Sequence, residues 1–233
     1  MSAPLIHEMP MRWADLDELS HVNNVVYLDY AVQARAAHVA AGELLDAPVG
    51  SVSVEYLRPL LLRRVPVVVA TRTVDDVLVQ EIAPAGADVP FARVTSRPRA
   101  ELQTLDTGQG EPYAVRVRHS DLGVDGTVTV SKVFEYAQEA RIASVVRARG
   151  VASPGRFVVA RVDLTVGEPF AWRPEPYAAE TAVTHVGTSS FTVSTLFEGG
   201  RYGRTDAVLV GFDLQAQRSR PLTDDERAAL TGA

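Results

Sequence analysis

Hydrophobic and polar residues alternate along several stretches of this chain, while one long early stretch follows a helical period. Segment 24–45 is apolar on most of its circumference, which predicts a long helix that the rest of the protein encloses. Alternating segments rich in valine and threonine predict strands after this helix. These segments are 51–59, 65–74, 77–82 and 92–97.

The second half of the chain follows the same plan. A second helix is predicted over 128–149, with Gly150 at its end, and four alternating segments come after it. These segments are 160–169, 177–185, 191–197 and 207–215. One strand, one helix and four further strands in each half indicate an α+β fold with antiparallel sheets.

The two halves also share residues at matching positions. When the sequence is shifted by 106 residues, Met11–Arg35 lies over Val117–Arg141, and eight of these 25 positions are identical. Average composition gives roughly two matches by chance, so we infer an ancient duplication. The identical pairs are Arg12/Arg118, Asp15/Asp121, Leu16/Leu122, Val22/Val128, Tyr30/Tyr136, Ala31/Ala137, Ala34/Ala140 and Arg35/Arg141. The last pair of arginines is predicted to form structural ion pairs.

The composition of the connecting segments sets the expected domain boundaries. We predict an N-terminal domain over 1–99, a linker over 100–113 and a C-terminal domain over 114–220. The linker is polar and holds two glycines and a proline. The tail, 221–233, begins with a Thr-x-x-Glu capping box, which predicts a short surface helix from about Asp224.

Composition and charge exclude several classes of function. With 233 residues and 46% hydrophobic residues, the chain has enough apolar material for two cores. Its net charge of −6 argues against a nucleic-acid-binding protein with a broad basic surface. Cysteine is absent and the histidines show no metal-ligand spacing, so we expect neither thiolate chemistry nor a metal site. No signal peptide or membrane-spanning run is visible, which predicts a cytoplasmic protein without membrane association.

The segment most informative about function is Arg12–Arg35, RWADLDELSHVNNVVYLDYAVQAR. It places two carboxylates, Asp15 and Asp17, in a short turn, and a His-Val-Asn-Asn step then leads into the first predicted helix. Backbone N–H groups at a helix start are unpaired and point outward. A carboxylate beside them is able to attack an acyl carbonyl, or to activate a water toward it, while the N–H groups stabilise the developing oxyanion.

This motif resembles that of the hotdog-fold thioesterases of the 4-hydroxybenzoyl-CoA and acyl-CoA type. The resemblance consists of Asp-x-Asp, His-Val-Asn-Asn, x-x-Tyr-Leu and a closing Ala-Arg, and plant and bacterial acyl-ACP thioesterases carry a similar signature. It is detailed over residues 11–35 and only architectural elsewhere. It implies two tandem hotdog domains, each a curved antiparallel sheet wrapped around a long central helix. The two hotdogs would pair within one chain, with the active site at their seam.

The resemblance also implies roles for the polar residues of the motif. The family's catalytic carboxylate corresponds to Asp17, acting as nucleophile or as general base, and the oxyanion donor corresponds to the backbone N–H near Asn24. His21 is a candidate for acid–base catalysis, for shaping the turn or for contacting substrate. Asn23 is a candidate for substrate binding or for a helix N-cap. Tyr27 is a candidate for lining the acyl pocket or for packing in the core.

The second half departs from this motif. It aligns Gly123 with Asp17, Thr127 with His21, Thr129 with Asn23 and Val130 with Asn24. We therefore expect one active site per chain, with the second half acting as scaffold. Asp125 would substitute for the missing acid only if the turn were redrawn. Asp15, whose counterpart Asp121 is kept, is predicted to anchor the turn.

The leading prediction is hydrolysis of an acyl-CoA thioester to a free acid and CoA in fatty acid metabolism, without metal or cofactor. Arg58 is a candidate for binding substrate through the coenzyme phosphates. Acyl carrier protein stays open as the thiol donor, although Leu19 stands where the acyl-ACP branch usually has asparagine. Two other functions stay open, an enoyl-thioester hydratase or dehydratase and a non-catalytic acyl-CoA-binding protein. Association of chains into a homo-oligomer is also open.

Overall fold

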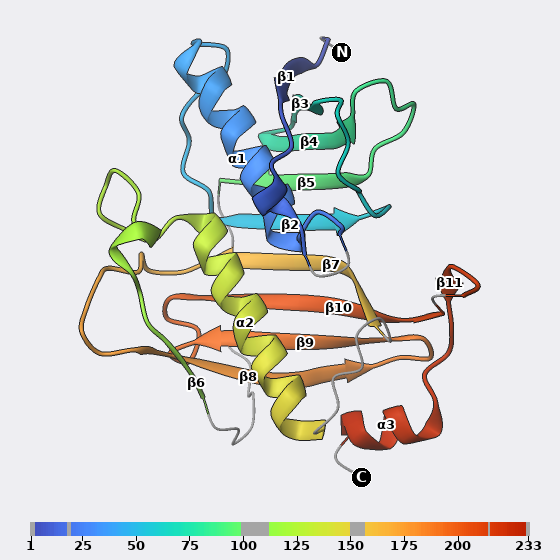
Figure 1. The fold of residues 1–233 in the computed structure, drawn as a ribbon. Helices are drawn as coiled ribbons and strands as arrows, with labels where there is room; N and C mark the ends of the chain where they lie inside the picture. Colours follow the sequence, from blue (N-terminus) through green and yellow to red (C-terminus); the bar gives the residue numbers. More distant parts are fainter. Residues whose placement is uncertain (1–2, 18–19, 99–111, 150–156, 214, 232–233) are drawn as a thin grey trace. The chain divides into compact units, whose positions relative to one another are not determined.

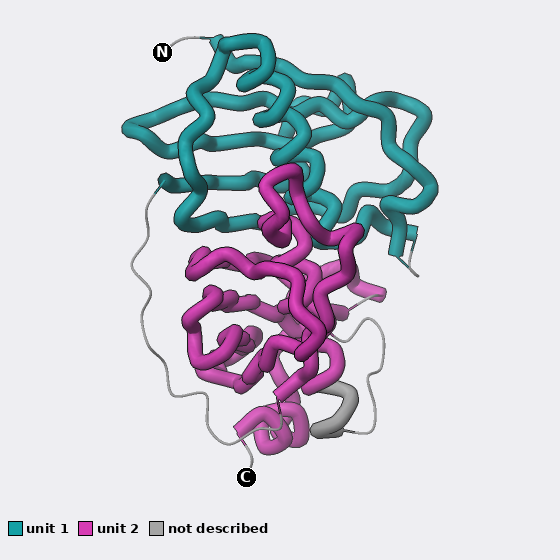
Figure 2. The backbone as a smooth tube through the Cα atoms, turned by 90° about the vertical axis from the view of Figure 1, so that its left-hand side faces the viewer, with its two compact units in different colours: residues 1–100 teal, residues 101–233 magenta. Residues whose placement is uncertain are grey.

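The computed structural model describes residues 3–17, 20–98, 112–149, 157–213 and 215–231. The chain divides into two compact units, Met1–Ala100 and Glu101–Ala233 (Figure 2). Nearly all of the predicted linker, 100–113, lies outside the described residues. None of the described helices is long and apolar enough to cross a membrane.

Unit 1 is an antiparallel sheet with one α-helix (Figure 1). Its elements are β1 (Leu5–Met9), the 3-10 helix η1 (Trp13–Asp15), α1 (Asn24–Ala40), β2 (Ser51–Tyr56), β3 (Val67–Val74), β4 (Val77–Pro84) and β5 (Ala92–Arg97). The strands follow the order β1-β3-β4-β5-β2, and each neighbouring pair is antiparallel. The helix α1 contacts all five strands.

The core of unit 1 lies between α1 and the sheet. Leu28, Ala31 and Ala34 on the inner side of the helix are at most 1% exposed. They meet the alternate valines and isoleucine of the strands, which are similarly buried: Val52, Val54, Val67, Val69, Ile82 and Val94. The buried Gln80 adds a polar contact, because its Nε2 donates to the carbonyl of Ala31 at 2.8 Å.

Unit 2 has a similar plan with longer strands. Its elements are β6 (Tyr113–Val115), the 3-10 helix η2 (His119–Asp121), α2 (Val130–Arg149), β7 (Phe157–Val166), β8 (Tyr177–Val186), β9 (Ser190–Phe197), β10 (Gly203–Asp213), β11 (Arg218–Ser219) and α3 (Asp224–Thr231). The strands follow the order β7-β10-β9-β8-β6, and β11 pairs with β10. In the core, the ring of Phe170 packs within 6.3 Å, centroid to centroid, of four other aromatic rings.

These elements correct the predicted fold class. The expected α+β arrangement of two tandem hotdog domains, each a curved sheet wrapped around a long central helix, is wrong. The described chain is mainly antiparallel sheet, with eleven strands and three short α-helices. The sheet of unit 1 covers only the inner side of α1, and on the outer side Val32 is 42% exposed. The helix was expected to be apolar on most of its circumference partly because of Val32, Ala36 and Ala40. All three of these residues are exposed.

Most individual elements were nevertheless predicted correctly. The helix α1 begins at Asn24 as expected, but it ends at Ala40 because the chain turns at Gly42, where φ is +72°. The C-terminal helix α3 is confirmed together with its capping box. Thr223 Oγ1 accepts the N–H of Glu226 at 3.2 Å, and a carboxylate oxygen of Glu226 accepts the N–H of Thr223 at 2.9 Å.

Candidate active site

The predicted catalytic motif forms a closed turn between η1 and α1. The N–H of Asp17 donates to the carbonyl of His21 at 2.8 Å, and the N–H of Ser20 donates to the carbonyl of Asp17 at 3.0 Å. The loop before β3 holds this turn from the other side. There, the N–H of Val22 donates to the carbonyl of Leu60 at 2.7 Å, and His21 forms a β-bridge with the next residue of the loop.

Asp15 anchors the turn, as predicted from its recurrence in both halves. Its Oδ2 accepts the hydroxyl of Tyr30 at 2.7 Å and the backbone N–H of Arg12 at 2.7 Å. Burial, and then the hydrogen bond to Asp15 and its negative charge, raise the pKa of Tyr30 well above its ordinary value, so the hydroxyl remains a donor. In unit 2 the hydroxyl of Tyr136 donates to Asp121 at 2.6 Å in the same way.

Asp17 lies half-buried in the turn. Its Oδ1 accepts the backbone N–H of His21 at 3.0 Å, which fixes one carboxylate oxygen relative to the turn. Its charge also acts on Tyr27. Burial is the main cause that raises the pKa of Tyr27 to about 12. The hydrogen bond from the N–H of Leu60 lowers this pKa, and the negative charge of Asp17 raises it further. The carboxylate of Asp17 is therefore close enough to the Tyr27 ring for the two to interact electrostatically.

The two asparagines mark the start of α1. Asn23 is the N-cap, since its Oδ1 accepts the N–H of Val25 at 3.2 Å. Asn24 is the first residue of the helix, and its carbonyl accepts the hydroxyl of Tyr56 at 2.8 Å. Across the described part of the chain, no residue accepts a hydrogen bond from the backbone N–H of Asn24. This N–H is one of the unpaired donors of a helix N-terminus and is available to an anionic oxygen.

Tyr27 has the surroundings of a core residue. It is 3% exposed, and its ring packs edge-on against Tyr56 with the centroids 5.4 Å apart. Its hydroxyl oxygen accepts the N–H of Leu60 at 3.1 Å. Tyr27 therefore supports the loop that holds the motif turn, which corresponds to the packing alternative considered for this residue.

His21 and Arg58 lie nearer the surface. His21 is half-buried, and none of the residues that the structure describes forms a hydrogen bond with its imidazole. Arg58 is exposed in the loop between β2 and β3, where its backbone N–H donates to the carbonyl of Phe91 at 3.0 Å. Of the predicted site residues, Asp17, His21, Asn23 and Asn24 thus meet in one turn. Tyr27 lies beneath this turn, and Arg58 lies in the adjoining loop.

The equivalent turn of unit 2 keeps the backbone of the motif but has Gly123 and Thr127 in place of Asp17 and His21. The N–H of Gly123 donates to the carbonyl of Thr127 at 2.7 Å, as the N–H of Asp17 does to His21 in unit 1. The β-bridges match as well, with Leu122 pairing with Val128 and Thr127 pairing with Ala171. An imidazole at position 21 is therefore not required to form this turn, and in unit 2 a carboxylate from a different position, that of Asp125, accepts the N–H equivalent to the one that Asp17 accepts in unit 1.

Asp125 has the environment of a turn residue. Its side chain accepts the backbone N–H of Thr127 at 3.0 Å and the Thr127 hydroxyl at 2.9 Å. These two hydrogen bonds, the backbone one first, lower the pKa of Asp125. Its carboxylate is exposed, whereas Asp17 is half-buried, which disfavours Asp125 as a substitute for Asp17.

No group of three histidine, aspartate or glutamate side chains suited to a metal ion occurs among the described residues. The polar groups near the candidate site are instead one carboxylate, one imidazole and the start of a helix. This set of groups suits acyl transfer to water, with a base or nucleophile beside an oxyanion donor.

Comparison with known proteins relates the chain to thioesterases. The family model of the acyl-ACP thioesterase C-terminal domain matches residues 1–61, which contain β1, the motif turn and α1. The 12:0-ACP thioesterase from Umbellularia californica is 12% identical with a TM-score of 0.68, over 94% of each chain. An acyl-ACP thioesterase from Bacteroides thetaiotaomicron VPI-5482 is 9% identical with a TM-score of 0.62, over 88% of this chain and 96% of the other. No curated protein matches the sequence.

At these identities the solved structures show a shared fold, while the family match covers the motif itself. The predicted enzyme class, a thioester hydrolase, is supported by the family match over residues 1–61. The matching family model belongs to the acyl-ACP thioesterases, the branch that leucine at position 19 was expected to disfavour. Leu19 lies outside the described residues. The motif did not indicate that Tyr30 supports the turn through its hydrogen bond to Asp15. The recurrence of this tyrosine as Tyr136 in the second half was the feature of the sequence that could have indicated it.

Proposed function

We propose that this chain hydrolyses an acyl thioester of coenzyme A or acyl carrier protein to a free acid and a thiol, at the turn between η1 and α1. The observation that carries this proposal is the contrast between the units. Both units form the same backbone turn, but only the turn of unit 1 contains an aspartate at position 17 and a histidine at position 21. In unit 2 the exposed Asp125 accepts the equivalent N–H, so the turn closes without an acid at position 17 or a histidine at position 21, and we attribute the half-buried Asp17 and His21 to chemistry.

In this mechanism Asp17 either attacks the thioester carbonyl or removes a proton from the water that attacks it. The carbonyl oxygen gains negative charge and accepts a hydrogen bond from the N–H of Asn24, at the positive end of the helix dipole. The carbon–sulfur bond then breaks, and the sulfur leaves as a thiolate that takes up a proton. His21, which lies in the same turn, is proposed to supply that proton. If Asp17 is the attacking group, a mixed anhydride between the acyl group and Asp17 remains, and a water hydrolyses it to the free acid and restores the carboxylate.

The other predicted residues act around this centre. Asn23 caps the helix whose first N–H binds the oxyanion, and Tyr27 supports the turn from the core side. The acyl group would come from fatty acid metabolism. Support for a carrier protein as the thiol donor comes from the family match to acyl-ACP thioesterases.

A substrate panel tests the proposal. Thiol release is measured with saturated acyl-CoA and acyl-carrier-protein thioesters of several chain lengths, and water addition is measured with an enoyl-CoA. We expect thiol release from saturated acyl thioesters. Hydration of the enoyl-CoA without thiol release would instead establish a hydratase, and saturable binding without either reaction would establish a binding protein.

A further inference from the structure

The loop before β3 carries a concentration of positive charge. This basic loop, residues 57–66, contains Arg58, Arg63 and Arg64, which are all exposed, and no acidic residue. Within the described ranges, no carboxylate forms an ion pair with any of the three. The guanidinium of Arg63 lies 6.0 Å from the ring centroid of Phe91, at the outer limit of a cation–π contact.

The basic loop connects the candidate active site to an open pocket. Its residue Leu61 forms a β-bridge with His21 in the motif turn. Two residues further on, Arg63 and Arg64 line a pocket of about 500 Å³ together with Met9–Met11. Glu8 is the acidic residue that lines the same pocket, so arginines outnumber carboxylates there by two to one. Since two residues span at most about 7 Å of chain, the pocket begins close to the turn.

The equivalent loop of unit 2 lacks this free positive charge. Its β-bridge between Thr127 and Ala171 matches that between His21 and Leu61, so Arg173 stands in the position of Arg63. Arg173 is ion-paired with Glu198, and its guanidinium lies 3.6 Å from the ring centroid of Tyr177.

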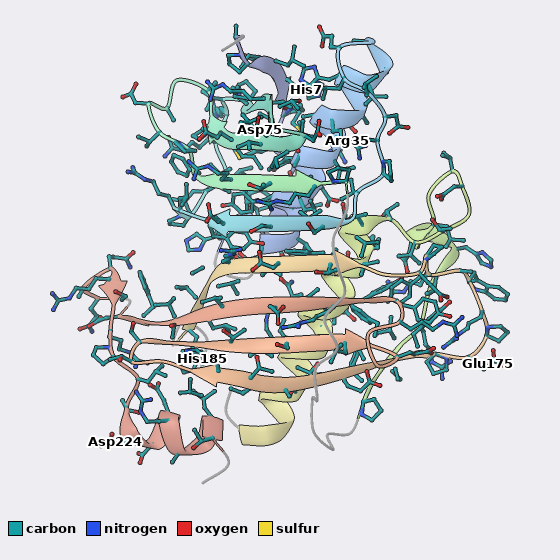
Figure 3. The ribbon with its side chains drawn as sticks, turned by 180° about the vertical axis from the view of Figure 1, so that it is seen from behind. His7, Arg35, Asp75, Glu175, His185 and Asp224 are labelled. Carbon is teal, nitrogen blue, oxygen red and sulfur yellow. The ribbon has the colours of Figure 1, made fainter. Side chains whose placement is uncertain are left out.

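Two acidic residues, Glu168 and Glu175, also lie in this second loop, and Figure 3 shows Glu175 just before β8. Arginine is therefore neutralised beside the turn that lacks a catalytic acid. Among the described residues, the arginines of the basic loop, beside the turn that carries Asp17, have no carboxylate partner.

We propose that Arg63 and Arg64 bind the phosphate of the substrate's phosphopantetheine arm while the thioester lies at Asp17. This inference rests on the proposed function. A guanidinium presents two parallel N–H donors that match phosphate oxygens, and no carboxylate in the described part of the chain is ion-paired with either arginine. Coenzyme A and acyl carrier protein both carry this phosphate on a long pantetheine chain, so the same pocket serves either source.

The test compares Arg63→Ala/Arg64→Ala with wild type on three thioesters of one acyl group. Acyl-CoA and acyl carrier protein carry the phosphate, whereas acyl-N-acetylcysteamine does not. We expect KM for at least one phosphate-bearing substrate to rise about tenfold or more, because charge-assisted hydrogen bonds to the phosphate are lost. We expect kcat, and all kinetics with acyl-N-acetylcysteamine, to stay near wild type. A rise confined to acyl-CoA or to acyl carrier protein identifies the source of the phosphate.

Two further variants make the result specific. Arg63→Lys/Arg64→Lys keeps the charge and should restore part of the affinity, and Arg173→Ala removes the equivalent arginine of unit 2 and should leave KM unchanged. An equal loss on all three thioesters, or no loss on any, would overturn the assignment. If wild type hydrolyses no thioester, the proposed function fails on its own. Calorimetric binding of CoA to wild type and to the double alanine variant then still tests the two arginines.

Discussion

At the scale of single residues, recurrence between the halves separates structural from chemical roles. Asp15 and Tyr30 recur as Asp121 and Tyr136 and make the same short hydrogen bond in both units. The anchoring role of Asp15 could be predicted from that recurrence. Its partner could not, because fifteen residues separate the two and only the folded helix brings them together. Asp17, which does not recur, is the residue on which the chemistry is proposed to depend.

The tyrosine–aspartate pairs give a matched stability test. Tyr30→Phe and Tyr136→Phe each remove a hydroxyl that donates to a carboxylate, and each should lower the free energy of unfolding by roughly 1.5–3 kcal/mol in urea titrations. Only Tyr30→Phe should also reduce thiol release, on the order of tenfold to a hundredfold, because it loosens the turn that positions Asp17. Equal losses of activity in both variants would show that the two turns do not differ in function.

Buried Tyr27 predicts a loss of stability at alkaline pH. The folded state holds its proton up to a pKa of about 12, whereas the unfolded chain loses it near 10.0. The contribution is therefore fully present below pH 10 and is lost as the pH rises toward 12, by on the order of 1.4 kcal/mol per pH unit. Urea unfolding between pH 9 and 11 should show a shallower decline in Tyr27→Phe than in wild type. Identical slopes would mean that this hydroxyl is not buried as described.

At the scale of elements, periodicity located helices and strands well but did not show what covers them. The start of α1 at Asn24 and the capping box of α3 follow from local rules and were predicted. The expected enclosure of α1 was wrong because alanine packs in a core and is also tolerated on an exposed helix surface. Pattern alone did not distinguish the inner Ala31 and Ala34 from the outer Ala36.

Within unit 2, the approach of β7 to β10 depends on a glycine. A Cβ at Gly167 would lie 2.4 Å from the carbonyl oxygen of Arg201, a backbone atom that cannot move aside cheaply. Gly167→Ala should therefore destabilise the protein by about 1–3 kcal/mol in urea titrations. Gly187→Ala is the control, because its Cβ would meet nothing closer than 3.4 Å, and its effect should stay within about 0.5 kcal/mol. Equal effects would contradict the close approach.

At the scale of the whole molecule, two similar backbones carry different side chains. The plan of the two halves and the position of the motif could be predicted from the sequence. The basic loop could not be singled out, because the sequence does not show which surface arginines form ion pairs with carboxylates. Ion pairing depends on the fold. Arg173, just before β8, pairs with Glu198, just after β9, because these two strands form a hairpin.

The most direct test of one catalytic turn per chain is a matched pair of variants. Asp17→Asn and Asp125→Asn each remove one charge from equivalent turns. Circular dichroism of both variants serves as the control for correct folding. With the best acyl thioester of the panel, kcat of Asp17→Asn should fall by at least about a hundredfold, while Asp125→Asn should stay within about twofold of wild type. Near-normal turnover by Asp17→Asn, or an equal loss in Asp125→Asn, would contradict the account.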